Sequence, residues 1–126
     1  MLERSQSSSE QHSILVVDDH AGFRTSARLL LESQGFTVVG EVGDGASALA
    51  AVARLRPHAV LLDVQLPDID GFEVAERLAA GEYAPKVVLV SSRDRHDFGP
   101  LIEAAPVRGF LDKSDLSAEA LAELLG

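Results

Sequence analysis

The stretch His58-Ala59-Val60-Leu61-Leu62-Asp63 is a continuous apolar run that ends in a carboxylate. An earlier run, Ser13-Ile14-Leu15-Val16-Val17, ends in the same way at the acidic pair Asp18-Asp19. Continuous aliphatic runs of this length are typical of parallel strands that are buried on both faces. Ligands of open α/β sheets bind at the carboxyl ends of such strands. We therefore expect the three carboxylates at the ligand-binding edge of one sheet.

Three carboxylates gathered at one edge repel one another unless a cation neutralises them. Hard divalent cations prefer oxygen ligands. The arrangement therefore predicts that Asp18, Asp19 and Asp63 bind a divalent cation, and Mg²⁺ is the expected cofactor.

Strand-like and helix-like segments alternate five times along the chain. The expected strands are 13–18, 37–42, 58–63, 86–91 and 109–112. Strict alternation with short links predicts right-handed crossovers onto a parallel sheet and hence an α/β fold. In the second helix, Ala46, Leu49, Ala50 and Ala53 share one face, which we expect to pack on the core. The fourth helix is expected to be short, about 100–105, because Gly99-Pro100 and Pro106 bound it.

Length and composition indicate one cytoplasmic domain. The 126 residues are 46% hydrophobic, and residues 1–12 are polar and Ser-rich, so we expect a flexible tail followed by one domain over 13–126. There is no cysteine, which excludes disulfides and thiolate chemistry. The formal charge of −9 argues against nucleic-acid binding. No apolar stretch is long enough to cross a membrane or to act as a signal peptide.

A set of motifs then appears in order along the chain. It comprises Asp18-Asp19 after the first strand, Asp63 after the third, Pro67 and Gly71 behind it, Ser91 ending the fourth strand and Lys113 ending the fifth. With this set the chain resembles, over about 13–125, the receiver domain of two-component response regulators. The resemblance implies a doubly wound, flavodoxin-like (βα)5 three-layer sandwich with strand order 2-1-3-4-5. It is closest to the subgroup whose receivers often precede a helix-turn-helix DNA-binding domain, and no such domain is expected within these residues.

The resemblance also implies roles for the site residues. Asp63 is the expected phosphoacceptor, which takes a phosphoryl group from a sensor histidine kinase or a phosphotransfer protein. Asp19 is the expected direct Mg²⁺ ligand, Asp18 an indirect one, and the main-chain carbonyl of Gln65 completes the protein's contribution. Lys113 is expected to bridge the carboxylates at rest and a phosphoryl oxygen afterwards. Its neighbour Ser114 stands where the family commonly has proline.

Other residues carry the expected switch. Ser91 offers a hydroxyl to the phosphoryl group, and Phe110 holds the family's switch-aromatic position. The output surface is then the fourth helix, the fifth strand and the fifth helix, through which the chain associates with itself or with a partner. Gln65 and Arg93 are expected to tune the phosphate lifetime. The four histidines form no expected metal or catalytic set, and His20 is interpreted as a loop residue.

Three other functions are alternatives to a non-enzymatic receiver. A haloacid-dehalogenase-type phosphatase needs a second Asp two residues after the nucleophile, where this chain has Gln65. A flavin mononucleotide carrier needs a phosphate loop after the first strand, and Asp18-Asp19 would repel that phosphate. A receiver-like scaffold that has lost phosphorylation is the third alternative, and the retained acidic residues, Ser91 and Lys113 argue against it.

Overall fold

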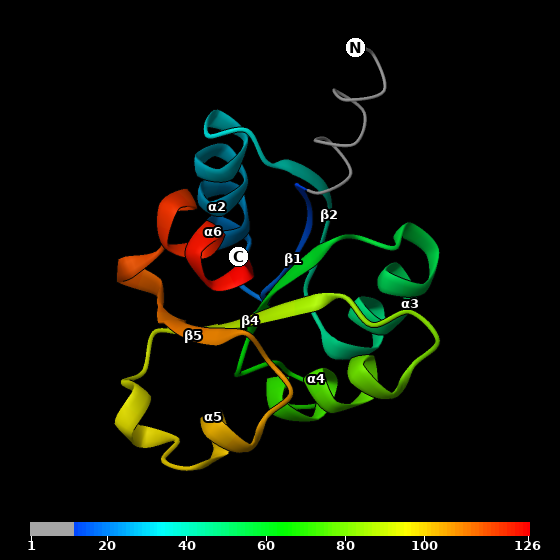
Figure 1. The fold of residues 1–126 in the computed structure, drawn as a ribbon, viewed down its shortest axis with the longest axis vertical. Helices are drawn as coiled ribbons and strands as arrows, with labels where there is room; N and C mark the ends of the chain where they lie inside the picture. Colours follow the sequence, from blue (N-terminus) through cyan, green and yellow to red (C-terminus); the bar gives the residue numbers. More distant parts are fainter. Residues whose placement is uncertain (1–11) are drawn as a thin grey trace.

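The computed structural model describes residues 12–126, so all but the last residue of the expected 1–12 tail lie outside the described residues (Figure 1). Five parallel strands form one sheet in the order β2-β1-β3-β4-β5. They are β1 (Ser13–Val17), β2 (Thr37–Val42), β3 (Ala59–Asp63), β4 (Lys86–Ser91) and β5 (Gly109–Asp112). The expected α/β class, strand order and strand positions are confirmed, the last to within one residue.

Helices cover both faces of the sheet. They are α2 (Ala21–Ser33), α3 (Gly45–Leu55), α4 (Gly71–Ala80), α5 (Leu101–Ala104) and α6 (Ala118–Leu125), with 3-10 turns η1 (Arg95–Asp97) and η2 (Lys113–Asp115). Figure 1 shows α2 and α6 on one side of the sheet and α3, α4 and α5 on the other. The chain is therefore the expected three-layer sandwich.

The two apolar cores, one on each face of the sheet, explain why a strand such as β1 is a continuous apolar run. Successive strand residues point to opposite faces of a sheet. In β1, Ile14 and Val16 pack with α2 and α6, whereas Leu15 and Val17 pack with α3 and α4. All four are fully buried. A strand covered on both faces has no solvent-facing position, so no polar alternation is seen in the sequence.

The prediction of which face of α3 packs on the core is wrong. Its buried residues are Gly45, Ala48, Ala51 and Val52, while Ala46, Ala50 and Ala53 are exposed and Leu49 is only half-buried. The rotation of α3 is set by the loop after β3: Asp68 accepts hydrogen bonds from the amides of Gly45 (2.8 Å) and Ala46 (2.9 Å). A side chain at Gly45 would collide with Ile69. Alanine is compatible with either face, so this long-range contact decides the orientation.

Asp68 is held as an anion by the same contacts. The hydrogen bonds from the amides of Gly45 and Ala46 lower the pKa of Asp68 to about 2. These amides lie at the start of α3, where free N–H groups and the helix dipole favour a negative charge. Asp44 caps the same helix by accepting from the amide of Ser47 at 2.7 Å. The loop that leaves β3 is thus tied to a neighbouring helix.

The α5 region matches the expected short helix. It forms one helical turn, and its N-cap position, Pro100, offers no side-chain hydrogen bond. Gly99 before it has a positive φ of 55°. Leu101 is 55% exposed although Ile102 is buried. A single turn with few buried contacts lies at the low-stability end of a fold.

Gly71 lies where the backbone of the β3–α4 loop returns to the end of β3. Its amide donates to the carbonyl of Val64 at 2.7 Å, and a Cβ there would lie 2.5 Å from the Asp63 carbonyl oxygen and 2.8 Å from the Val64 Cα. Because these obstacles are backbone atoms, Gly71→Ala is expected to lower the free energy of unfolding by about 1–3 kcal/mol.

Urea unfolding followed by circular dichroism measures this change. Gly22 in α2 is the matched control, since nothing lies within 4 Å of a Cβ built there. Gly22→Ala should be neutral or stabilising by up to about 1 kcal/mol. Equal effects of the two substitutions would show that the close approach at Gly71 is unimportant.

Candidate functional site

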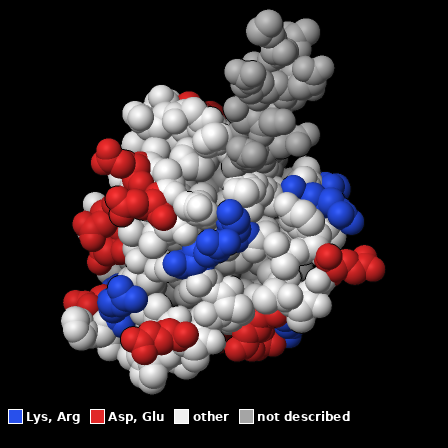
Figure 2. Space-filling model, viewed as in Figure 1, with Lys and Arg blue, Asp and Glu red and all other residues white. Residues whose placement is uncertain are grey.

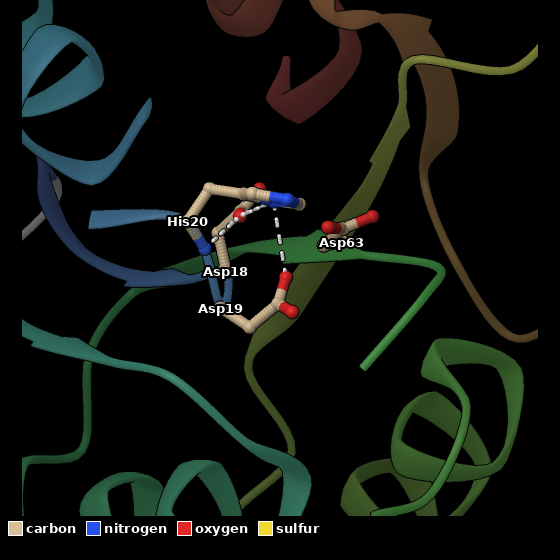
Figure 3. Close-up of side chains that lie close together, drawn as sticks. All are labelled: Asp18, Asp19, His20 and Asp63. Atoms are coloured by element: carbon tan, nitrogen blue, oxygen red, sulfur yellow. Dashed lines mark hydrogen bonds and ion pairs between the residues drawn. The ribbon is translucent and has the colours of Figure 1, made fainter. Parts of the chain in front are cut away.

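Neighbouring strands bring the three predicted carboxylates together. β1 and β3 pair in register, with Val17 opposite Leu62, so Asp18-Asp19 and Asp63 leave the sheet at the same edge. We refer to Asp18, Asp19 and Asp63 as the acidic site. One oxygen of each carboxylate and one ring nitrogen of His20 all lie within 4.8 Å of one another (Figure 3). Asp18 and Asp63 are buried, whereas the Asp19 side chain is 38% exposed.

Lys113 provides the expected cation. Its Nζ lies 2.6 Å from Asp18 Oδ2 and 3.3 Å from Asp63 Oδ2. The ring of Phe23 lies 4.5 Å from the same Nζ. The turn that carries Lys113 is held by Ser114, whose amide and hydroxyl both donate to Asp112 Oδ1, at 2.9 and 2.8 Å. Ser114 therefore stabilises this turn in the place where the family commonly has proline.

The buried environment shifts the pKa values of this pair. Burial, with a further contribution from the charge of Asp18, raises the pKa of Asp63 to about 6, against the opposing effects of the Gln65 amide and Lys113. Burial works to lower the pKa of Lys113, yet the contact with Asp18 and the charge of Asp63 outweigh it and raise that pKa above its ordinary value. At neutral pH Asp63 is thus mainly an anion and Lys113 a cation.

Because the pKa of Asp63 is raised, we expect the free energy of unfolding of the metal-free protein to fall as the pH rises. The ionised carboxylate is penalised in the folded state, so the penalty is absent below about pH 4, grows as the pH approaches 6 and is complete above it. Asp63→Asn should therefore raise the free energy of unfolding by about 1–3 kcal/mol at pH 7.5. Urea unfolding in EDTA at pH 7.5 and pH 4 measures it. A stabilisation of the same size at both pH values would contradict the burial effect.

Asp18 is fixed by contacts on both sides. Its Oδ1 accepts from the His20 amide at 2.8 Å, and its carbonyl accepts from the Arg24 guanidinium at 2.6 Å. Within residues 12–126, its Oδ2 accepts no hydrogen bond, so the short contact with Lys113 is an ion pair made outside hydrogen-bond geometry. Three carboxylates thus face one lysine. The excess negative charge and the oxygen donors fit a divalent cation such as Mg²⁺.

Of the remaining predicted residues, Gln65 contacts the acidic site through its main chain, whereas Ser91, Arg93 and Phe110 lie on β4, on the loop after it and on β5. Ser91 is fully buried at the end of β4, and its hydroxyl accepts from the Arg93 amide at 3.0 Å. The Gln65 amide donates to Asp63 Oδ1 at 3.1 Å, and its side chain is exposed. Arg93 pairs with Asp97 at 3.4 Å and lies over Phe98. The switch candidate Phe110, in β5, is 9% exposed.

Sequence reasoning did not single out Arg24 or Phe23 and set His20 aside, although His20 and Arg24 contact the acidic site and Phe23 contacts Lys113. His20 Nδ1 lies 3.1 Å from Asp19 Oδ1 and 3.2 Å from Asp18 Oδ1. The available signal was position: His20 directly follows the acidic pair, and the other two lie in the first turn of the helix after it. The interpretation of His20 as a loop residue gave that adjacency too little weight.

Comparisons with known proteins show which family the chain resembles. The model of the response regulator receiver domain family matches residues 14–125. A putative transcriptional regulator of Pseudomonas aeruginosa is 39% identical over 108 residues, which cover 86% of this chain and 52% of that protein. The DNA-binding transcriptional activator EvgA of Escherichia coli K12 is 30% identical over 101 residues, which cover 80% of this chain and 50% of EvgA. The chain thus spans about half the length of these relatives.

A solved structure shows the same fold. The signal receiver domain of the putative response regulator NarL from Mycobacterium tuberculosis superposes with a TM-score of 0.81 at 32% identity, covering 92% of this chain and 97% of that domain. The sheet order, the acidic site at its edge and the family match over nearly all of the described residues point to one conclusion. The chain belongs to the response regulator receiver domain family.

Proposed function

We propose that this chain is a phosphoacceptor receiver of a two-component system, in which Asp63 accepts a phosphoryl group from a sensor histidine kinase or a phosphotransfer protein. The observation that carries the proposal is a buried carboxylate, Asp63, with Lys113 Nζ at 3.3 Å and two further carboxylates beside it. A carboxylate that attacks a negatively charged phosphoryl group needs positive charge beside it. Lys113, and a cation held by the other carboxylates, would supply that charge.

The transfer exchanges one bond for another. An oxygen of Asp63 forms a bond to phosphorus as the bond from phosphorus to the donor's histidine nitrogen breaks, and that nitrogen keeps the electron pair. Asp18, Asp19, Asp63 and the Gln65 carbonyl would hold Mg²⁺, which supplies charge neutralisation. Lys113 lies between two carboxylates at rest and can hold a phosphoryl oxygen afterwards. The Ser91 hydroxyl is a second donor for that group.

Acetyl phosphate labelling tests the proposal. In the presence of Mg²⁺ the intact mass should rise by about 80 Da, the mass of one phosphoryl group. With EDTA in place of Mg²⁺ the mass should not change. A protein that stays unlabelled under both conditions would instead favour the phosphorylation-independent scaffold. The non-enzymatic assignment is favoured over a dehalogenase-type phosphatase because Gln65, two residues after Asp63, has no acidic side chain.

Aromatic contacts join α4 to the proposed output face, which comprises α5, β5 and α6. Phe110 of β5 packs against Phe98 with ring centroids 5.7 Å apart, and Phe98 packs at the same distance on Phe72 of α4. Phe98 is followed by Gly99 and Pro100, which lead into the single-turn helix α5. A movement of Ser91 and Phe110 on phosphorylation can therefore be passed to a segment that is easily reorganised.

Hydrogen exchange should detect that switch. Adding beryllofluoride and Mg²⁺ to mimic the phosphorylated state should change amide protection more in residues 92–112 than in any other described stretch. The Asp63→Asn variant is the control, because it lacks the carboxylate that the mimic binds. Protection changes confined to other segments, or the same changes in the variant, would rule this switch out.

The proposed partners are proteins. We propose that the output face binds a separate partner or a second copy of the chain, and that the chain makes no nucleic-acid contact itself. Its formal charge is −9, and Figure 2 shows acidic side chains gathered on the side of the view where α6 lies. In residues 12–126, no helix combines the length and apolarity needed to cross a membrane. The proposed location is the cytoplasm, where sensor kinases transfer their phosphoryl groups.

A further inference from the structure

His20 places an imidazole nitrogen among the carboxylates of the acidic site. The ring lies beside Asp18 and Asp19, as Figure 3 shows, and its Nδ1 is 3.2 Å from Asp18 Oδ1 and 3.1 Å from Asp19 Oδ1. The side chain is 71% exposed, so solvent ions can reach it. In the neutral tautomer that carries its proton on Nε2, Nδ1 presents a lone pair to this group.

The spacing suits adjacent ligands of one metal ion. Two neighbouring ligands in octahedral coordination at about 2.1 Å from the ion lie about 3.0 Å apart. Nδ1 of His20 has that separation from one oxygen of each of two carboxylates. Lys113 does not compete for this position, because it contacts Oδ2 of Asp18 whereas His20 contacts Oδ1.

Charge balance points to a divalent ion at the same place. The carboxylates of the acidic site face one lysine, which leaves two negative charges uncompensated while His20 is neutral. Asp18 is fully buried, and its Oδ2 already pairs with Lys113 at 2.6 Å. The remaining negative charge of the acidic site gains from a further cation. A dication bound beside His20 and Asp19 supplies it.

We propose that His20 Nδ1 is a ligand of this dication, and that the site therefore favours borderline metals such as Co²⁺, Ni²⁺ and Zn²⁺ over Mg²⁺ more strongly than carboxylates alone would. Imidazole suits such ions, whereas Mg²⁺ prefers oxygen donors. The inference rests on the proposed function in one respect, namely that a dication binds at the acidic site. His20 then sets which dication occupies it.

Calorimetric titration of the untagged chain with Co²⁺ and with Mg²⁺ provides the test, using wild type, His20→Asn and His96→Asn. His96 is a matched control: it contacts Asp94 through its amide (2.9 Å) and Nδ1 (2.9 Å), as His20 contacts Asp18. Asp94 and His96 belong to no group of three potential metal ligands in residues 12–126. The comparison therefore isolates the effect of the acidic site from that of the local turn.

His20→Asn should weaken Co²⁺ binding on the order of tenfold and Mg²⁺ binding by less than about threefold, because asparagine keeps an oxygen but lacks the imidazole nitrogen. His96→Asn should change neither. Zn²⁺ should also shift the Nδ1 resonance of His20 in ¹⁵N NMR. An unchanged Co²⁺ to Mg²⁺ affinity ratio in His20→Asn, or an equal loss in His96→Asn, would overturn the inference. Failure of the proposed function is distinguishable, since Asp19→Asn would then leave the binding of both metals unaltered.

Discussion

Replacement of Asp63 by asparagine should abolish labelling by acetyl phosphate, a loss of at least roughly 100-fold, because an amide is a poor nucleophile towards phosphorus. The substitution keeps the size and shape of the side chain. It also removes a buried charge whose pKa is raised to about 6, so the folded state should persist. Intact-mass analysis after incubation with acetyl phosphate and Mg²⁺ measures the effect.

Asp115→Asn is the control for this experiment. Asp115 lies in the exposed turn η2, two residues after Lys113, and the change alters the net charge by the same amount. This variant should label as wild type does. Stoichiometric labelling of Asp63→Asn would mean that another residue is the acceptor.

Asp19→Asn should cause the second large loss. The change removes the proposed direct ligand of Mg²⁺, and it should weaken Mg²⁺ binding at least about tenfold and slow labelling by on the order of 100-fold. Asp19 is the best carboxylate for this purpose, because its side chain is 38% exposed while that of Asp18 is fully buried. Loss of function in this variant is thus separable from loss of fold.

Titration with Mg²⁺ followed by NMR of backbone amides, together with labelling rates over a range of Mg²⁺ concentrations, measures both quantities. Thermal unfolding confirms that the variant is folded. Should Mg²⁺ cause the same spectral changes and the same rates in wild type and Asp19→Asn, Asp19 would not be a ligand.

Local sequence predicted most of the architecture. Strands β1, β3 and β4 could be located because strands buried on both faces are uninterrupted aliphatic runs, and β3 is buried at every position. The strand order came from the resemblance to a family, since the runs themselves carry no order. The core face of α3 could not be predicted, because its orientation depends on Asp68 and Ile69, more than twenty residues further along the chain.

The residues of the site that lie at the carboxyl ends of strands could be predicted from the sequence. Asp18, Asp19 and Asp63 each follow directly from that rule. Lys113 is different, since its contacts with Asp18 and Asp63 join residues 95 and 50 positions apart, and the motif order was needed to find it. The contacts of His20 could not be predicted, because a histidine in a loop has no distinguishing pattern and only the folded backbone turns its Nδ1 towards two carboxylates.

Peptide mapping of the phosphorylated chain tests the central proposal most directly. After incubation with acetyl phosphate and Mg²⁺, a mass increase of about 80 Da, that of one phosphoryl group, should occur only in the peptide that contains Asp63. It should disappear on mild alkaline treatment, as an acyl phosphate does, and be absent when EDTA replaces Mg²⁺. A phosphoryl group on any other peptide, or equal labelling of the Asp63 peptide in EDTA, would contradict the proposed Mg²⁺-dependent receiver.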